Sequence, residues 1–347
     1  MLTEEPAEVI DCLLVEWRSD AEPPHFAIFL LPIMESAVEM YGGASSLELL
    51  RLGDLNGAEN AADREVARFD GGGSSECVWG ARLVCAELRA LRGDVEGCLS
   101  YLEGFPPPTS ATDCARLKML QGSYEGSLGR YRRADQLLSE AEILARYENA
   151  AELLGEIDLS RGFIFFLQKN YFASEKSYRE ALKVAGQSGG WYLRGHGLWG
   201  IGKTRMIRTE CEEAIPWLEE SLAIFEAAGA RLSIALVWGE LGVCRLGLGR
   251  DEEAMELFRK AEMVNRDTGF VHNCQVVLAN IGNVYLYRRD YFTALSYYRR
   301  ALSLARKIKD PVSVKKWTYN INLAYARIRA AVDQNSSHVA RSSAEQR

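Results

Sequence analysis

Long hydrophobic runs, paired cysteines and a basic excess are all missing from this sequence of 347 residues. It contains no run of about 18 apolar residues, so no membrane-spanning helix is expected. Its first residues, MLTEEPAEVI, are acidic where a signal peptide is basic, and export is not expected. The eight cysteines are scattered without a C-x-x-C pair, which is typical of reduced core thiols. These features predict a cytoplasmic protein without a membrane partner.

The net charge of −7 is mildly acidic and argues against general nucleic-acid binding. The charge is unevenly distributed, however. Residues 299–347 hold 11 basic and 3 acidic residues, a net charge of +8, which leaves −15 for the rest. The basic end is either a solvated last helix and tail or a docking surface for an acidic partner.

Signatures of catalysis are also missing. The four histidines form no H-E-x-x-H motif, no cysteine or carboxylate spacing completes a metal set, and no serine lies in G-x-S-x-G. Acidic pairs such as Glu212–Glu213 fall on outward-facing helical stripes, where charge is solvated. We therefore predict a protein that is not an enzyme and that uses no metal or cofactor.

One short stretch conflicts with this interpretation. GLWGIGKT, residues 197–204, matches the phosphate-binding pattern G-x-x-x-x-G-K-[ST]. A phosphate-binding loop must follow a β-strand, and the preceding KVAGQSGGWYLRGHG contains no β-branched run to form one. Gly202 also belongs to a column of glycines that recurs without a following lysine. We therefore expect no nucleotide binding.

That column reveals a repeat with a period of 40 residues. It comprises Gly122, Gly162, Gly202, Gly242 and Gly282. Twelve residues later stand small residues: Ala134, Ser174, Ala214, Ala254 and Ala294. Four further on are large apolar ones: Leu138, Tyr178, Leu218, Phe258 and Tyr298. A second small column follows: Ala141, Ala181, Ser221, Ala261 and Ala301.

The columns predict pairs of antiparallel helices. Each unit holds two segments with apolar residues at i, i+3, i+4 and i+7, separated by a polar break such as LGR or RRD. Small residues allow the two helices to approach closely, and the large residue fills the space between units. A single unit cannot bury its apolar face, so the units must stack into a solenoid.

The column set resembles the tetratricopeptide repeat family. NIGNVYLYRRDYFTALSYYRRAL matches best, with Gly282, Tyr285, Ala294, Tyr298 and Ala301 at family positions. The family repeat has 34 residues, so the period of 40 implies longer helices. The resemblance implies an all-α, right-handed α-solenoid of stacked helix-turn-helix units.

The repeats divide the chain into three parts. Residues 1–40 are expected to form N-terminal capping helices, and 41–331 the array, with about seven helix pairs and a C-terminal capping helix. Residues 332–347 are polar and aperiodic, and a disordered tail is expected there.

The resemblance also implies where a ligand binds, because the first helix of each unit lines the concave face in this family. The family positions give an apolar, aromatic groove for a protein or peptide. Its predicted residues are Phe163, Phe166, Trp199, Lys203, Met206, Val243, Leu246, Asn280, Asn283, Leu286 and Tyr287. Lys203 and the asparagines are the remnant of the clamp with which some members hold a C-terminal carboxylate. Asn280, Asn283 and Asn320 also resemble the asparagines with which long-period members hold a peptide backbone.

Two functions are consistent with this interpretation. The first is a non-enzymatic scaffold that binds a protein or peptide in its concave groove. The second is the recognition module of a signalling or CHAT-type, caspase-like protease system, because the array resembles those that precede such protease domains. A peptide-sensing transcription regulator is disfavoured, since no basic recognition helix is present.

Overall fold

The computed structural model describes residues 55–69, 75–91, 93–104, 108–188 and 190–345, together with Ser46 and Leu49. Every secondary-structure element in these residues is an α-helix. The predicted capping helices of residues 1–40 lie outside the described residues. The all-α solenoid predicted from the repeat columns is confirmed.

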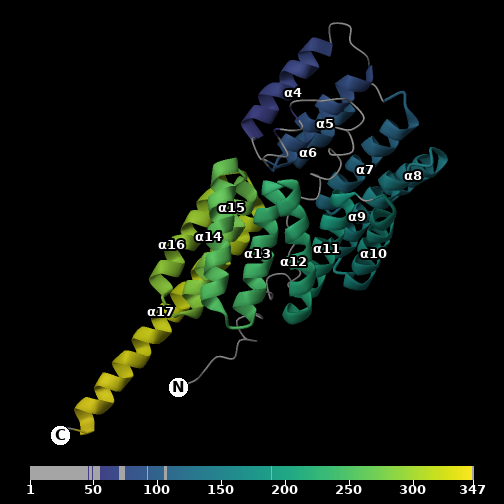
Figure 1. Ribbon diagram of the computed structural model, residues 1–347. Helices are drawn as coiled ribbons and strands as arrows, with labels where there is room; N and C mark the ends of the chain where they lie inside the picture. The colour runs from purple at the N-terminus through teal and green to yellow at the C-terminus, as the bar shows by residue number, and fades with distance from the viewer. Residues whose placement is uncertain are drawn as a thin grey trace.

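The helices follow one another as antiparallel pairs (Figure 1). Their bounds are α4 Leu55–Phe69, α5 Ser75–Leu91, α6 Val95–Glu103, α7 Ala111–Ser127, α8 Tyr131–Tyr147, α9 Ala151–Leu167, α10 Tyr171–Ser188, α11 Trp191–Ile207, α12 Cys211–Ala228, α13 Arg231–Gly247, α14 Asp251–Thr268, α15 Val271–Tyr287, α16 Tyr291–Lys307 and α17 Pro311–Glu345. The five units defined by the 40-residue columns are the helix pairs from α7–α8 to α15–α16. Each first helix also contacts the first helices of neighbouring units, so the odd-numbered helices form one layer.

The repeat columns are the contacts inside each pair. A Cβ atom added to Gly242 would lie 2.5 Å from the ring of Phe258, and one added to Gly282 would lie 2.7 Å from the ring of Tyr298. Members of both small-residue columns and of the large apolar column are almost fully buried. Where a serine replaces alanine, as at Ser174, its hydroxyl donates to the carbonyl of Gly162 at 2.8 Å. Glycine therefore stands where a side chain of the second helix occupies the space.

Upstream of these five units the chain forms α4, α5 and the short helix α6. Gly93 has a φ of 89°, and the carboxylate of Asp94 accepts a hydrogen bond from the Gly97 amide to cap α6. With nine residues, α6 is half the length of the later second helices. It ends at Gly104, just before the proline cluster of residues 106–108, which cannot continue a helix.

The C-terminal end differs from the sequence-based expectation. α17 packs on α16 as the predicted capping helix, but it continues to Glu345, through most of the segment expected to be disordered. Residues 332–345 contain no glycine or proline. Intrinsic propensity therefore opposes helix only weakly there, and a helix already nucleated by packing can propagate.

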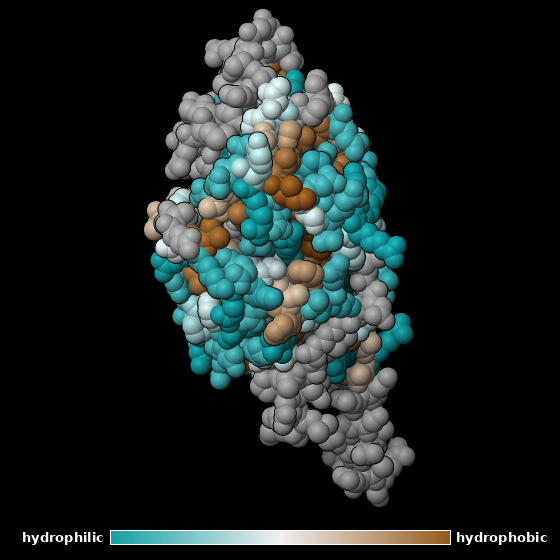
Figure 2. Space-filling model, turned by 90° about the vertical axis from the view of Figure 1, so that its right-hand side faces the viewer, coloured by the Kyte–Doolittle hydropathy of each residue, from teal (hydrophilic) through white to brown (hydrophobic). Residues whose placement is uncertain are grey.

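The surface is mostly polar. Figure 2 shows one face on which hydrophilic residues dominate and hydrophobic residues gather in separate patches near the middle. Among the described residues, no helix combines the length and hydropathy that a membrane crossing requires.

Candidate binding surface on the first helices

All the predicted groove residues lie on first helices, as expected, but the structure divides them into two sets. The first set, on α9, α11 and α13, is buried and comprises Phe163, Phe166, Trp199, Lys203, Met206 and Leu246. The second set, on α13 and α15, is half-buried and comprises Val243, Asn280, Asn283, Leu286 and Tyr287. The two sets have different physical roles.

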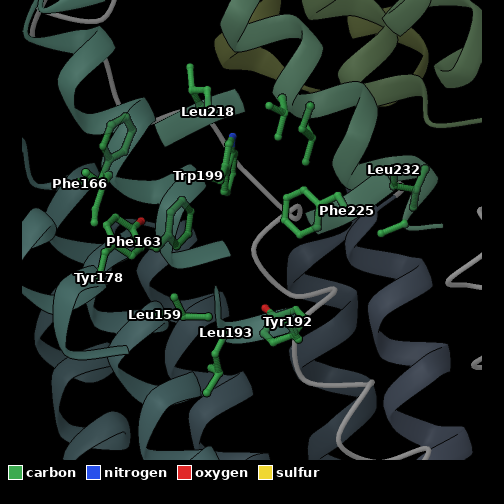
Figure 3. Packing of buried hydrophobic residues seen from close by; sticks show 14 of the residues in the cluster. Leu159, Phe163, Phe166, Tyr178, Tyr192, Leu193, Trp199, Leu218, Phe225 and Leu232 are labelled. Atoms are coloured by element: carbon green, nitrogen blue, oxygen red, sulfur yellow. The ribbon is translucent and has the colours of Figure 1, made fainter. Parts of the chain in front are cut away.

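The aromatic members of the first set belong to the hydrophobic core. Figure 3 shows Phe163, Phe166 and Trp199 close together, with Tyr178 beside the two phenylalanines. The ring of Phe166 lies 5.8 Å from that of Tyr171, and Trp199 is only 1% exposed. The expected open aromatic surface is therefore not found at these residues, because their rings are packed in the buried core.

Lys203 is buried but electrically compensated. Its Nζ lies 3.1 Å from Oε1 of Glu240 on α13, and 4.9 Å and 5.5 Å from the ring centroids of Trp199 and Phe166. An ion pair and two aromatic faces together stabilise a buried ammonium group. A partner's carboxylate would have to compete with Glu240 for this lysine. Lys203 thus joins two units.

His196 is a core histidine. Its ring lies 4.5 Å from that of Tyr192 and 4.8 Å from that of Phe225. Burial lowers the pKa of His196 to about 3, so the imidazole is neutral at pH 7. No group of three histidine, cysteine or carboxylate side chains in the described part of the chain could hold a metal ion.

The stretch GLWGIGKT lies wholly inside α11. Added Cβ atoms on Gly197, Gly200 and Gly202 would lie 2.8 Å, 2.6 Å and 2.7 Å from side chains of Leu182, Tyr178 and Leu218. These glycines therefore serve helix packing, as the sequence predicted. No strand-loop-helix arrangement exists there to hold a phosphate.

The second set forms a surface with hydrogen-bonding capacity. Oδ1 of Asn283 accepts a hydrogen bond of 2.6 Å from the hydroxyl of Tyr298, which holds the side-chain amide in one orientation. Asn280, one turn earlier, makes no side-chain hydrogen bond to another described residue. Gly239 on α13 has open space where a Cβ would be. It lies one turn from Val243, which occupies in α13 the repeat position of Asn283 in α15.

Asn320 is less accessible to solvent than Asn280 and Asn283. It is on α17, at the repeat position of Asn280, and is only 5% exposed. Of the three asparagines that resemble a peptide clamp, Asn280 and Asn283 are therefore the ones that the structure leaves accessible.

Sequence analysis missed two residues that organise this region. Glu240 neutralises Lys203, and Tyr298 orients Asn283. For Glu240, the sequence contained a signal in its distance from Lys203. Glu240 follows Lys203 by 37 residues, the period less one helical turn, and Tyr124 donates to Glu87 across the same separation. In both of these pairs the two residues lie on adjacent first helices.

Comparisons with known proteins support the repeat assignment. Two family models described as tetratricopeptide repeat match residues 235–268 and 277–312. These ranges coincide with the α13–α14 and α15–α16 units. No curated protein matches the sequence.

Solved structures of low sequence identity share the fold. A Rap protein complexed with competence and sporulation factor has a TM-score of 0.60 at 17% identity, over 88% of this chain and 90% of that one. Aspartyl phosphate phosphatase F from Bacillus subtilis has a TM-score of 0.53 at 14% identity, over 89% and 84%.

A third structure has a different length. A STAND protein from Pyrococcus horikoshii with a tetratricopeptide repeat sensor has a TM-score of 0.55 at 15% identity. The match covers 96% of this chain but only 54% of that protein. Together with the repeat columns and the two matched units, these likenesses define the architecture. The chain is therefore a helical solenoid in which the α13–α14 and α15–α16 units match tetratricopeptide repeat models.

Proposed function

We propose that this chain is a non-catalytic scaffold that binds an extended peptide segment of a partner protein across the first helices α13 and α15. The observation that carries the proposal is the oriented amide of Asn283, beside Asn280 and the half-buried apolar side chain of Leu286. The Rap protein of similar fold is a complex with competence and sporulation factor, which supports ligand binding by this type of solenoid.

The chemistry of this surface suits a peptide backbone. The Tyr298 hydroxyl occupies one lone pair of Asn283 Oδ1 and leaves the two amide protons for a ligand carbonyl. Asn280 offers both a donor and an acceptor one turn away. Val243, Leu286 and Tyr287 supply apolar area for alternate side chains of the ligand. Backbone hydrogen bonds give affinity, and the apolar contacts give specificity.

The buried set supports this surface from behind. The buried side chains pack between the helices and set the distance between first helices; they are Phe163, Phe166, Trp199, Met206 and Leu246. The Lys203–Glu240 ion pair links α11 to α13. A ligand at α13 and α15 contacts none of the aromatic core residues. Their truncation would weaken binding only by disturbing the scaffold.

A selection from a phage library of random linear peptides tests the proposal. Peptides enriched on the wild-type chain should bind the Asn280→Ala/Asn283→Ala variant at least about tenfold more weakly, since two or more hydrogen bonds of roughly 1 kcal/mol each are lost. Asn60→Ala removes an exposed amide on α4 and should change nothing. Equal binding to both variants, or no enrichment at all, contradicts the proposal.

A second candidate role is that of a recognition module in a larger signalling system. The STAND protein with a tetratricopeptide repeat sensor supports it, because this chain matches little more than half of that protein. Co-expression with the product of an adjacent gene would test this role. If the chain is a recognition module, the two products should co-purify and the chain should alter the activity of the other product.

A further inference from the structure

The repeat places one more polar side chain in line with the asparagines of the proposed peptide surface. Glu240 stands 40 residues before Asn280, so it occupies the same repeat position on the preceding first helix, α13. Both side chains are half-buried. The next member of this row, Asn320 on α17, is only 5% exposed. The accessible row of polar side chains therefore continues from α15 onto α13 and not onto α17.

One carboxylate oxygen of Glu240 is available to a ligand. Its Oε1 lies 3.1 Å from Nζ of Lys203, whereas its Oε2 makes no hydrogen bond with another described residue. The side chain of Glu240 is 16% exposed and that of Lys203 is 5% exposed. The lysine therefore holds the carboxylate from the buried side, and the second oxygen keeps its capacity to accept a hydrogen bond.

The backbone beside Glu240 leaves room for a ligand. The preceding residue is Gly239, and a Cβ atom added there would meet nothing within 4 Å. The same repeat position holds the buried Trp199 in α11 and the buried Ala279 in α15. Glycine allows another chain to approach the backbone closely. A peptide can therefore lie close to α13 at this point without displacing a side chain.

The charge balance favours a neutral N–H donor over a cation at this oxygen. Lys203 and Glu240 neutralise each other, and the lysine also lies over the rings of Trp199 and Phe166. A ligand ammonium or guanidinium group would bring a second positive charge to one carboxylate, close to a buried lysine. Like charges repel strongly in such a partly desolvated place. A backbone amide adds no net charge and leaves the ion pair balanced.

We propose that Oε2 of Glu240 accepts a hydrogen bond from a backbone amide of the bound peptide, and that Lys203 is the positioning residue that holds the carboxylate for it. This inference rests on the proposed peptide-binding function and deepens it. Asn283 donates to a ligand carbonyl and Glu240 accepts from a ligand amide, and one edge of an extended chain presents both groups. Lysine and arginine are disfavoured at the ligand position that faces Glu240.

Removal of single amide protons from the ligand tests the proposal on the unchanged protein. The probe is the tightest binder from the random-peptide selection, synthesised as a series in which each backbone amide in turn is N-methylated. Fluorescence anisotropy measures the affinity of each member. One N-methylated peptide should bind the wild-type chain at least about tenfold more weakly, because a hydrogen bond to a charged acceptor is lost.

A protein variant without the acceptor identifies the amide that contacts Glu240. Lys203→Met/Glu240→Leu replaces both partners by apolar side chains, so no buried charge is left unpaired. The variant should bind the parent peptide at least about tenfold more weakly. The N-methylation that is costly on the wild-type chain should then change the affinity by less than about twofold, because the two changes remove the same interaction.

A conservative variant separates hydrogen bonding from a purely structural role. Lys203→Met/Glu240→Gln keeps a carbonyl oxygen at position 240 and should retain most of the affinity and the sensitivity to N-methylation. Arg300→Met/Glu262→Leu removes an ion pair of 2.8 Å between α16 and α14, in the layer of second helices, and should change neither. Thermal unfolding by circular dichroism checks that each variant is folded.

A failure of this inference is distinguishable from a failure of the proposed function. If Asn280→Ala/Asn283→Ala weakens binding but the N-methylated series responds alike on wild type and on Lys203→Met/Glu240→Leu, the role of Glu240 alone is overturned. Equal losses with leucine and with glutamine at position 240 overturn it in favour of a structural role. Enrichment of lysine or arginine at one ligand position, lost with the leucine variant, overturns it in favour of a charged side chain. If the selection enriches no peptide, the proposed function fails and this inference fails with it.

Discussion

In some turns the repeat requires a backbone conformation that the residue at that position disfavours. The turn between the two helices of a unit contains one residue with positive φ, which is Gly129, Lys169, Thr209, Gly249 or Arg289. Thr209 has a φ of 69° although its side chain is β-branched. Such residues are rare in the left-handed region, where Cβ crowds the backbone. The repeat geometry therefore imposes strain on Thr209.

Replacement of Thr209 by glycine should stabilise the protein. The left-handed conformation costs a residue with a Cβ roughly 1–2 kcal/mol, and glycine avoids this cost but loses some unfolded-state entropy on folding. We expect Thr209→Gly to raise the free energy of unfolding by about 1 kcal/mol in urea titration. Gly249→Thr, at the same position of the next unit, is the reciprocal control and should lower it. A less stable Thr209→Gly protein would show that the strain is absent.

Asp158 predicts a pH dependence. Burial raises the pKa of Asp158 to about 6, with further contributions from Glu142 and Glu180, while Arg161 opposes the rise. Arg161 helps little because it lies 2.6 Å from Glu142 but 4.0 Å from Asp158. The unfolded carboxyl has a pKa of about 3.9. Between about pH 4 and 6 the folded state holds more protons, so stability falls as pH rises through this window.

Asp158→Asn should remove this penalty. We expect the variant to be more stable than wild type by on the order of 2 kcal/mol at pH 7.5, after allowance for partial solvent screening, and by little at pH 3.5. Asp267→Asn changes an acid on α14 that is half exposed and provides the control. Denaturant titrations across pH measure both. A pH-independent difference between wild type and Asp158→Asn would contradict the raised pKa.

At the scale of one helix, two of the three glycines of α13, Gly239 and Gly242, have opposite roles. Gly242 belongs to the repeat column, and a Cβ there would lie 2.5 Å from the buried ring of Phe258. Gly239, less than one turn earlier, has nothing within 4 Å of an added Cβ. Helix propensity disfavours both glycines equally, so packing alone distinguishes them.

The two alanine variants should therefore change stability in opposite directions. Gly239→Ala should stabilise by up to about 1 kcal/mol through helix propensity. Gly242→Ala should destabilise by about 1–3 kcal/mol, because Phe258 must move in a close-packed site. Thermal and urea unfolding measure the difference. If both variants were stabilised, the α13–α14 pair would be looser than the contact distances indicate.

The helix pairs were largely predictable, whereas the candidate site was only partly so. Gly242 and Phe258 follow columns that repeat every 40 residues, and repetition reveals them without knowledge of the partner helix. Trp199 and Val243 both occupy first helices, yet one is buried and the other half-buried. Their difference depends on the side chains that neighbouring units place against them, which no column records.

On the scale of the whole molecule, a buried hydrogen-bond network holds α17 against α15 at the C-terminal end of the solenoid. The indole Nε1 of Trp317 donates to Gln275 at 3.1 Å, and the Gln275 amide donates to Asp310 at 3.1 Å. Asp310 in turn accepts from the Ser313 amide and caps α17. These buried contacts fasten α17 to α15 across the last unit. A solenoid couples each unit mainly to its neighbours, so this hydrogen-bond network should stabilise the last unit more than distant ones.

Loss of this hydrogen-bond network should lower local stability at the C-terminal end of the molecule only. Trp317→Ala removes a side chain that is 3% exposed and should cost about 3–5 kcal/mol in the last unit. Hydrogen exchange measured by mass spectrometry should accelerate in α15, α16 and α17 and stay unchanged in α7 to α10. The N-terminal units are the internal control. A uniform acceleration would show that the array unfolds as one cooperative body.

The sequence by itself determined the helix pairs, their stacking and the reason for the glycines, because the constraint that creates each is repeated five times. Only the tertiary structure decided that Lys203 is neutralised by Glu240, that Tyr298 orients Asn283 and that α17 continues to Glu345. Those features depend on contacts between neighbouring units. A periodic pattern encodes what each unit shares, and burial and charge pairing depend on where the units differ.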